Sequence, residues 1–301
     1  MGVGMILFQK ASAFSMEQLH RVMVSAFSDY VIQMEMPLAD FERMITTRGF
    51  DPELSWVAVE DEQLVGFWFI GKQAAYPGVV YAVSTGTVPD ARGKGIASKL
   101  FAKVEEHALK AGYGKIQLEV ITSNTAAVKA YEKLGFATER NFQCFSQQKT
   151  AFSERSTTAQ PVIASWSELE PQAFELWQKP PSWQNSAYAV RTQGDEAASY
   201  KIEQNGKLAA YITITRKTGS VMQLAVAPEH RGKGFASALI ATAFANVEKE
   251  ALTFINVDES DETIMQALPK LGAIKTLQQY EMHRPLQTVA DHVEENELTT
   301  H

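Results

Sequence analysis

Cysteine is almost absent from the sequence, because Cys144 is the only one in 301 residues. A single thiol excludes an intrachain disulfide framework, and a lack of disulfides is typical of a reducing compartment. Cys144 lies in an alternating stretch, residues 141–145, that is typical of a strand. A lone cysteine in such a place is more often a small apolar filler than a nucleophile. We therefore expect it to fill space.

Long apolar runs are also missing. No stretch reaches the roughly 18 consecutive residues that a membrane-spanning helix needs. The first eight residues lack both the basic and the long apolar segment of a secretory signal. The sequence therefore predicts a cytoplasmic protein without a membrane partner.

Basic residues do not outnumber acidic ones in either half of the chain. Residues 1–150 hold 15 Lys and Arg against 16 Asp and Glu, and the remainder holds 13 against 19. Proteins that bind the phosphate backbone of nucleic acids are normally basic. We therefore expect no nucleic-acid partner.

An internal repeat is the most informative feature that is present. Residues 89–100 read PDARGKGIASKL and residues 228–239 read PEHRGKGFASAL, which are identical at eight of twelve positions. Downstream of each, Lys-Leu-Gly recurs at residues 133–135 and 270–272. The chain is also about twice the length of a ~150-residue domain. The similarity thus predicts two copies of one domain.

Each copy has the same order of expected elements. Two short strand patterns flank a polar turn at residues 56–69, and their counterpart at 200–214 flanks the hairpin signal Asn205-Gly206. A strand, a glycine loop, a helix, a strand, a helix and a strand follow. This order predicts an α/β fold with a mixed, α+β type of sheet in each copy. The predicted boundaries are 1–148 for the first domain, 149–160 for a polar linker, 161–285 for the second domain and 286–301 for an acidic flexible tail.

The glycine loops predict a phosphate-binding site. In the first copy the strand pattern of Val79–Val88 runs through Arg92-Gly93-Lys94-Gly95 into a helical pattern. The apolar side chains on one face of that helix are Leu100, Phe101, Val104 and Ala108. Such a turn directs backbone N–H groups and the positive end of the helix dipole at one point, and glycine leaves room for a phosphate. The alternative is a simple tight turn that caps a helix. The recurrence of the loop sequence in both copies favours the phosphate site over this alternative.

Two common phosphate motifs fail on spacing. A P-loop needs glycine where this chain has Val88, and a dinucleotide-binding fingerprint needs a third glycine where it has Ser98. The pattern Arg-x-x-Gly-x-Ala after a strand and a proline, present in both copies, resembles instead the acyl-CoA signature of the Gcn5-related N-acetyltransferase (GNAT) superfamily.

This resemblance implies two tandem GNAT-like acyl-CoA N-acyltransferase domains, with acetyl-CoA or another acyl-CoA as co-substrate and no metal. It implies that backbone N–H groups of the loop hold the CoA pyrophosphate, while the preceding strand edge pairs with the pantetheine arm. The implied cofactor-binding residues of the first copy are Thr87, Val88, Arg92, Gly93, Lys94, Gly95, Ile96, Ala97, Ser98 and Asn124. Those of the second copy are Val226, Ala227, Arg231, Gly232, Lys233, Gly234, Phe235, Ala236 and Ser237.

A candidate base and acid follow the first loop. Residues 116–120 alternate, so that Glu119 lies on the face opposite to the apolar side chains. The pattern of this region is similar to that of GNAT acetyltransferases: it consists of Glu119, the Ser-Asn pair at 123–124, Tyr131 and the Leu-Gly-Phe at 134–136. This resemblance implies Glu119 as base and Tyr131 as acid. A primary ammonium with a pKa of ~10.4 needs such a proton acceptor. A solvated Glu119, a packing Tyr131 and an Asn124 that only caps the next helix are the alternatives.

The second copy differs at both positions. Alignment on the repeated Leu-Gly places Asn256 at the position of Glu119 and Leu268 at that of Tyr131. We therefore expect the first domain to be the catalyst and the second to lack this chemistry. The expected reaction is transfer of an acyl group to a primary amine of a small molecule, peptide or protein by direct attack in a ternary complex, in a monomer or homodimer. A non-catalytic acyl-CoA sensor is the alternative.

Overall fold

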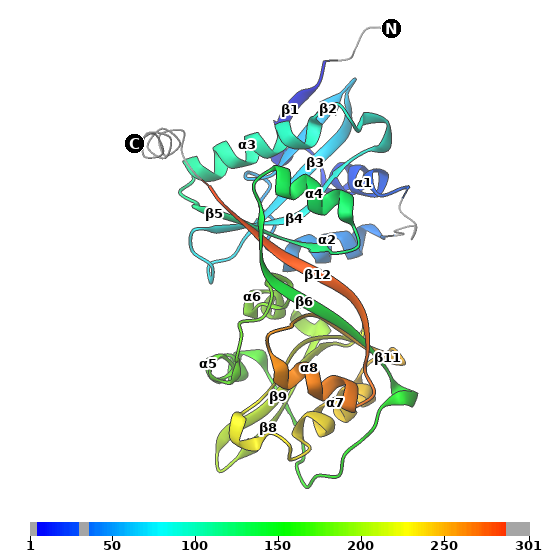
Figure 1. The fold of residues 1–301 in the computed structure, drawn as a ribbon, viewed down its shortest axis with the longest axis vertical. Helices are drawn as coiled ribbons and strands as arrows, with labels where there is room; N and C mark the ends of the chain where they lie inside the picture. The colour runs from blue at the N-terminus through cyan, green and yellow to red at the C-terminus, as the bar shows by residue number, and fades with distance from the viewer. Residues whose placement is uncertain (1–4, 30–35, 287–301) are drawn as a thin grey trace, which may run out of the picture. The chain divides into compact units, whose positions relative to one another are not determined.

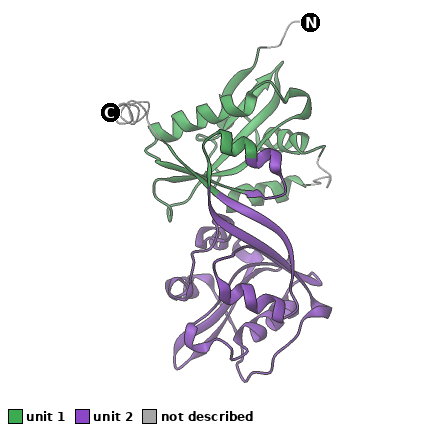
Figure 2. Cartoon of the chain, in the orientation of Figure 1, with its two compact units in different colours: residues 1–119, 129–137, 282–301 green, residues 120–128, 138–281 purple. Residues whose placement is uncertain are grey.

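The computed structural model describes residues 5–29 and 36–286 (Figure 1). Its contacts divide the chain into two compact units that are not contiguous in sequence. Unit 1 consists of residues 1–119, 129–137 and 282–301, and unit 2 of residues 120–128 and 138–281 (Figure 2). The acidic tail predicted for 286–301 lies, except for Leu286, outside the described residues.

The two sequence repeats fold into the same order of elements. The first repeat forms β1 (Leu7–Lys10), α1 (Met16–Ala26), α2 (Leu38–Thr47), β2 (Trp56–Glu60), β3 (Gln63–Lys72), β4 (Val79–Thr87), α3 (Ile96–Lys110), β5 (Lys115–Ile121), α4 (Thr125–Lys133) and β6 (Ala137–Gln148). The second forms β7 (Val162–Ala164), α5 (Trp166–Leu176), α6 (Ala187–Thr192), β8 (Ala197–Gln204), β9 (Lys207–Thr215), β10 (Ser220–Val226), α7 (Phe235–Asn246), β11 (Ala251–Asp258), α8 (Glu262–Lys270) and β12 (Ile274–Pro285).

The sheet of each unit is mixed, as the sequence predicted. In unit 1, β1 to β4 pair antiparallel in chain order, and β4 pairs parallel with β5. In unit 2, β7 to β10 pair antiparallel in the same way, and β10 pairs parallel with β11. The predicted mixed α/β fold is therefore confirmed.

Helices cover both faces of the unit 1 sheet. A side chain added at Gly86 would meet Ala26 of α1, whereas one added at Gly66 would meet Ile96 and Leu100 of α3. Glycine at these two points lets the helices approach the strands closely. The apolar face predicted for α3, formed by Leu100, Phe101, Val104 and Ala108, is at most 2% exposed. The 3.6-residue period of that face is thus what fixes α3 on the sheet.

The parallel strands separate soon after they pair. The register of β4 and β5 covers only Val79–Tyr81 against Lys115–Gln117, although β4 continues to Thr87. The register of β10 and β11 is equally short, at Ser220–Val221 against Thr253–Phe254. Beyond these pairs, the edge of β4 in unit 1 and that of β10 in unit 2 are therefore open to pairing with another extended segment beside the glycine loop.

The last strands of the two repeats are exchanged. In unit 1 the neighbour of β5 is β12, and in unit 2 the neighbour of β11 is β6. Arg284 of β12 donates to the carbonyl oxygen of Leu134 and to Glu105 of α3, and its guanidinium lies 4.7 Å from the centre of the Phe101 ring. The compact units and the predicted repeats thus divide the chain differently.

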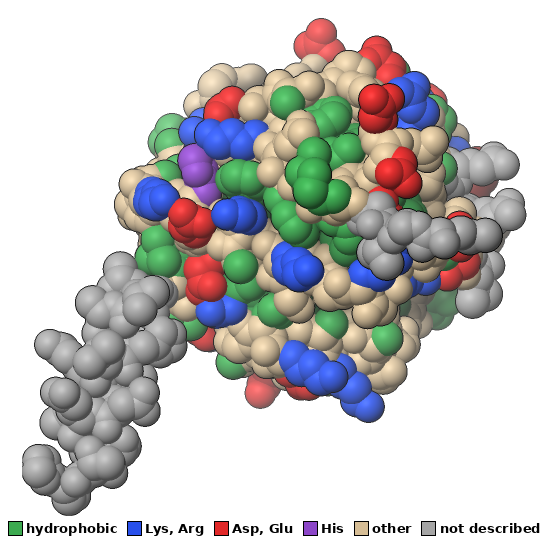
Figure 3. Space-filling model, turned by 90° about the horizontal axis from the view of Figure 1, so that it is seen from above, with side chains coloured by type: hydrophobic (Ala, Val, Ile, Leu, Met, Phe, Trp, Pro, Cys, Tyr) green, Lys and Arg blue, Asp and Glu red, His purple; other side chains and the backbone are tan. Residues whose placement is uncertain are grey.

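Charged side chains of both signs are intermixed on the molecular face shown in Figure 3, with apolar side chains between them. Within residues 5–29 and 36–286, no helix combines the length and the apolar character needed to cross a bilayer.

Candidate functional site

The first glycine loop (Arg92–Ser98) leads from β4 into α3. A short 3-10 helix, Pro89–Ala91, follows β4, and Gly95 is the N-cap residue of α3. Gly93 and Gly95 have φ angles of 78° and 72°, a left-handed conformation that favours glycine. A Cβ atom at either position would meet nothing within 4 Å. Six of the seven loop residues are exposed, with Ile96 as the exception, so the N–H groups that begin α3 face open space.

The arginine of this loop is held by the protein. Arg92 donates through Nε to the carbonyl oxygen of Thr87 (3.1 Å) and through Nη2 to that of Ala26 (2.9 Å). Two further bonds of 2.5 and 2.9 Å reach the carboxylate of Asp29. The hydrogen bond from Arg92 holds the pKa of Asp29 below its usual value, because the guanidinium stabilises the carboxylate. Arg92 therefore fixes the loop against the end of α1, and Lys94 of the same loop donates to the carboxylate of Glu60 at 2.9 Å.

The candidate base and acid both contact β4. The hydroxyl group of Tyr81 donates to Oε2 of Glu119 at 3.2 Å, and Oγ1 of Thr85 lies 2.9 Å from the hydroxyl oxygen of Tyr131. Tyr81 is the last β4 residue in register with β5, and Thr85 belongs to the separated part of β4. Both pairs thus lie where the two strands diverge.

The ring of Tyr131 is fixed by two aromatic neighbours. Its centre lies 6.1 Å from that of Trp68, nearly perpendicular to it, and 5.8 Å from that of Phe136. Such edge-to-face contacts hold a ring in one orientation. Tyr131 therefore packs, as the alternative interpretation expected, while its hydroxyl group has a polar partner as well.

Asn124 is a helix cap. Its Oδ1 accepts a hydrogen bond of 3.1 Å from the N–H of Ala127 at the start of α4. This bond satisfies one of the donors that a helix leaves unpaired at its first turn. This contact agrees with the alternative interpretation, in which Asn124 caps the next helix. The role of Asn124 in binding the cofactor stays a prediction.

The second glycine loop (Arg231–Ser237) repeats the backbone of the first. Gly232 and Gly234 have φ angles of 77° and 83°, and Gly234 is the N-cap residue of α7. Arg231 donates through Nε to the carbonyl oxygen of Val226 at 3.2 Å, as Arg92 does to Thr87. The two loops are therefore equivalent in geometry.

Their surroundings differ, because the connecting segment (residues 149–160) lies on the second loop. A Cβ atom at Gly234 would be 2.9 Å from Cβ of Thr157 and 3.2 Å from the carbonyl oxygen of Ser156. The N–H of Arg155 donates to Oγ of Ser237 at 2.8 Å. Ser237 is 1% exposed, and only Gly232 and Lys233 of this loop are exposed. The N-terminal end of α7 is therefore largely covered by the connecting segment, whereas the N-terminal end of α3 is open.

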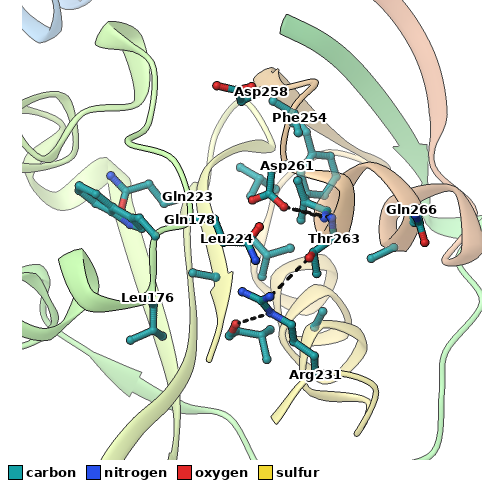
Figure 4. Close-up of a pocket in the computed structure, with 18 of the residues that line it drawn as sticks. Leu176, Gln178, Gln223, Leu224, Arg231, Phe254, Asp258, Asp261, Thr263 and Gln266 are labelled. Atoms are coloured by element: carbon teal, nitrogen blue, oxygen red, sulfur yellow. Dashed lines mark hydrogen bonds between the residues drawn. The ribbon is translucent and has the colours of Figure 1, made fainter. Parts of the chain in front are cut away.

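Unit 2 also contains a cavity of about 590 Å³ beside this loop. It lies between β10, β11 and α8, and Arg231 reaches across it to Oγ1 of Thr263 at 3.4 Å (Figure 4). Two of its lining residues are joined through Tyr211: Trp177 donates to the hydroxyl oxygen of Tyr211 (2.6 Å), which donates to Gln223 (2.7 Å). Burial raises the pKa of Tyr211 well above its usual range, an effect that the bond from Trp177 partly offsets. Tyr211 therefore remains a neutral hydrogen-bonding group.

The positions of Glu119 and Tyr131 carry no proton donor or acceptor of this kind in the second repeat. Asn256 is 5% exposed, donates to Ser182 at 3.3 Å and accepts from Gln279 at 2.8 Å. Leu268 is fully buried in the apolar core. Neither side chain can serve as a carboxylate base or a phenolic acid.

Tyr81 and Thr85 are the site residues that sequence reasoning missed. They stand 38 and 46 positions from their partners and belong to no motif. Among the described residues, no group of three or more His, Cys, Asp and Glu is arranged to bind a metal.

Comparison with known proteins identifies the family. The model of the acetyltransferase (GNAT) family matches residues 16–136 and 163–273. The chain is 35% identical over 121 residues to a mycothiol acetyltransferase of Brachybacterium faecium, which covers 38% of this chain and 35% of that protein. It is 33% identical over 119 residues to an acetyltransferase of Pectobacterium atrosepticum, which covers 40% of this chain and 78% of that protein. The match thus spans about a third of the mycothiol acetyltransferase.

Solved structures agree with the fold over almost the whole chain. A GCN5-related N-acetyltransferase from Sphaerobacter thermophilus superposes with a TM-score of 0.70 at 14% identity, covering 94% of this chain and 96% of that one. A tandem GNAT protein from the clavulanic acid biosynthesis pathway gives 0.69 at 16% identity, with 94% and 99% covered. The resemblance drawn from the glycine loops is thereby confirmed, and the chain belongs to the GNAT acetyltransferase family, with two repeats of its domain.

Proposed function

We propose that the first repeat is an N-acetyltransferase that uses acetyl-CoA, or another acyl-CoA, to acylate a primary amine of a small molecule, peptide or protein. The observation that carries this proposal is the placement of the Glu119 and Tyr131 partners where β4 and β5 diverge, beside an open glycine loop. The N–H groups of Arg92–Ser98 would bind the pyrophosphate. The edge of β4 at Thr87 and Val88 would pair with the amides of the pantetheine arm.

In this reaction the substrate nitrogen loses two protons and the leaving thiolate gains one. Glu119 accepts a proton from the substrate ammonium, directly or through a water, and the neutral amine attacks the thioester carbonyl. A C–N bond forms and the C–S bond breaks, so that the thiolate leaves. The attacking nitrogen gives up its second proton as the amide forms, which balances the proton that the thiolate takes up. A phenol of pKa near 10 protonates a thiolate of pKa near 8.5 uphill by about 2 kcal/mol. The hydrogen bond that Tyr131 gives to the leaving sulfur is therefore as important as full proton transfer.

The direct test is release of free thiol from acetyl-CoA in the presence of a panel of primary amines. We expect thiol release and an acetylated product of the corresponding mass with at least one amine class. CoA binding without thiol release from any amine would contradict catalysis and leave only binding. No CoA binding at all would contradict the whole proposal.

The difference between the two glycine loops predicts one tight CoA site per chain. Residues 155–157 cover the start of α7, so a pyrophosphate would have to displace them there, whereas the start of α3 is open. Calorimetric titration with CoA should therefore give a stoichiometry of one. The assignment of Val226, Ala227 and Arg231–Ser237 to a second cofactor stays a prediction from the sequence, and we expect that site to be weaker.

A matched pair of variants identifies the occupied loop. Gly93 and Gly232 are equivalent, have nearly equal φ angles and have open space in front of them. Alanine in a left-handed conformation costs about 1 kcal/mol and places a methyl group in the path of the phosphate. Gly93→Ala should weaken CoA binding about tenfold, and Gly232→Ala should leave it unchanged. Two equivalents of CoA, or a weakening caused by Gly232→Ala alone, would refute this expectation.

A further inference from the structure

We infer that Thr85 is a positioning residue for the candidate acid, Tyr131, and determines where the phenolic hydrogen points. This inference deepens the proposed function and rests on it. Oγ1 of Thr85 lies 2.9 Å from the hydroxyl oxygen of Tyr131, within hydrogen-bonding distance. The threonine hydroxyl group can donate or accept here. When it donates, the phenolic hydrogen of Tyr131 is left to point at another acceptor.

Thr85 and its cross-strand neighbour together hold Tyr131. Thr85 is in register with Trp68 of β3, and the Trp68 ring is the nearly perpendicular neighbour of the Tyr131 ring. Trp68 is 2% exposed and is itself packed against Phe101 of α3. The indole therefore restricts the plane of the phenol, whereas the hydroxyl hydrogen can still rotate about the C–O bond. A hydrogen bond from Thr85 restricts that rotation.

The second repeat shows the same three positions without the polar pair. Ile212 of β9 is in register with Leu224 of β10, as Trp68 is with Thr85. Leu268 stands at the position of Tyr131 and, with Ile212, is fully buried in one apolar cluster against which Leu224 packs. Where the tyrosine is replaced by leucine, the threonine is replaced by leucine too. A hydroxyl group at position 85 therefore accompanies the phenol, which a role in packing alone would not require.

The chemistry assigns the direction of the bond. When Tyr131 offers its hydrogen to the leaving sulfur, its oxygen can accept a hydrogen only from a neighbour, and Thr85 supplies one. If the proton then moves to the thiolate, Thr85 keeps its own proton and stabilises the phenolate that remains. No proton passes through Thr85. Tyr131 is the catalytic residue and Thr85 acts through it.

The test compares Thr85→Val, which keeps the shape and removes the hydroxyl group, with Thr85→Ser, which keeps the hydroxyl group. We expect Thr85→Val to lower kcat on the order of tenfold, the usual effect of one lost hydrogen bond in a transition state, with little change in KM for acetyl-CoA. Thr85→Ser should retain most of kcat. In a Tyr131→Phe background, Thr85→Val should cause no further loss. Equal damage by both variants, or a full additional loss in that background, would show a packing role and overturn the inference.

A second readout does not depend on an acceptor substrate. With tyrosine labelled by ¹³C at Cζ, the Tyr131 resonance is assigned by its disappearance in Tyr131→Phe, and its pH titration is followed. Loss of a hydrogen-bond donor to the phenolate should move the midpoint up by about half to one pH unit in Thr85→Val and not in Thr85→Ser. An unchanged midpoint in Thr85→Val would overturn the inference even in an active enzyme. A shifted midpoint in a protein that acetylates no amine would overturn the proposed function instead.

Discussion

Glu119→Gln should lower kcat/KM for the amine by a factor of about 10² to 10⁴, the usual contribution of a general base. Glutamine keeps the size of the side chain and can accept the hydrogen bond that Tyr81 donates to Glu119, but it cannot take a proton. At neutral pH a primary amine with a pKa of ~10.4 is almost wholly protonated. The variant can therefore use only the small fraction of the amine that is neutral.

The pH dependence distinguishes this explanation from a structural defect. In the variant the rate should rise about tenfold per pH unit up to the pKa of the amine, because the concentration of neutral amine rises at that rate. At high pH the variant should therefore approach the wild-type protein. A damaged site would stay slow at every pH.

Glu132→Gln is the matched control. Glu132 lies on the same repeat, in α4, and is exposed. Removing this carboxylate changes the net charge of the chain by the same amount as Glu119→Gln without reaching the strand divergence. We expect wild-type kcat/KM. Comparable activity in Glu119→Gln and Glu132→Gln would remove Glu119 from the mechanism.

Arg140→Met should lower the free energy of unfolding of the protein by about 3 to 5 kcal/mol, the range for breaking a buried ion pair from one side. Arg140 of β6 makes two bonds to the carboxylate of Glu281 in β12, at 2.8 and 2.6 Å. It also donates to the carbonyl oxygen of Pro180 and lies over the ring of Phe142. The Glu281 side chain is 2% exposed, and that of Asp258, which lies 3.5 Å from Nη1 of Arg140, is 10% exposed. The variant would therefore take this cation away from two largely buried carboxylates.

Urea unfolding at neutral pH measures this effect, and a second variant tests its cause. Glu281→Gln in the Arg140→Met background should recover part of the lost stability, because the more deeply buried of the two charges is then gone. Arg191→Met is the control. Arg191 is paired with Glu170, but its side chain is 57% exposed, and exposed pairs contribute at most about 1 kcal/mol. Equal losses from Arg140→Met and Arg191→Met would argue against a buried-charge penalty.

This ion pair has a topological meaning. β6 closes the first repeat in sequence and β12 closes the second, yet both contribute to the sheet of unit 2, and the end of β12 reaches unit 1. The Arg140–Glu281 pair joins the two strands within unit 2, and Arg284 secures β12 within unit 1. Because each unit includes a strand from the other repeat, we expect neither repeat to be stable when expressed alone.

The local features of the fold were predictable from the amino-acid sequence. The repeated glycines fixed the left-handed turns that begin α3 and α7, because few other residues adopt those φ angles without strain. The apolar period predicted the buried face of α3, and the resemblance to GNAT proteins implied Glu119 as base and Tyr131 as acid. Each of these features depends on residues close together in the chain.

Contacts between segments that are distant in the chain depend instead on the folded structure. Tyr81 and Thr85 meet Glu119 and Tyr131 through strand register and helix packing, which no local pattern encodes. The exchange of β6 and β12 likewise depends on which of two similar sheet edges each strand joins, and backbone hydrogen bonds alone do not distinguish them. The same holds for the polar connecting segment: its composition predicted a linker, but its contacts with Gly234 and Ser237 make the two glycine loops unequal.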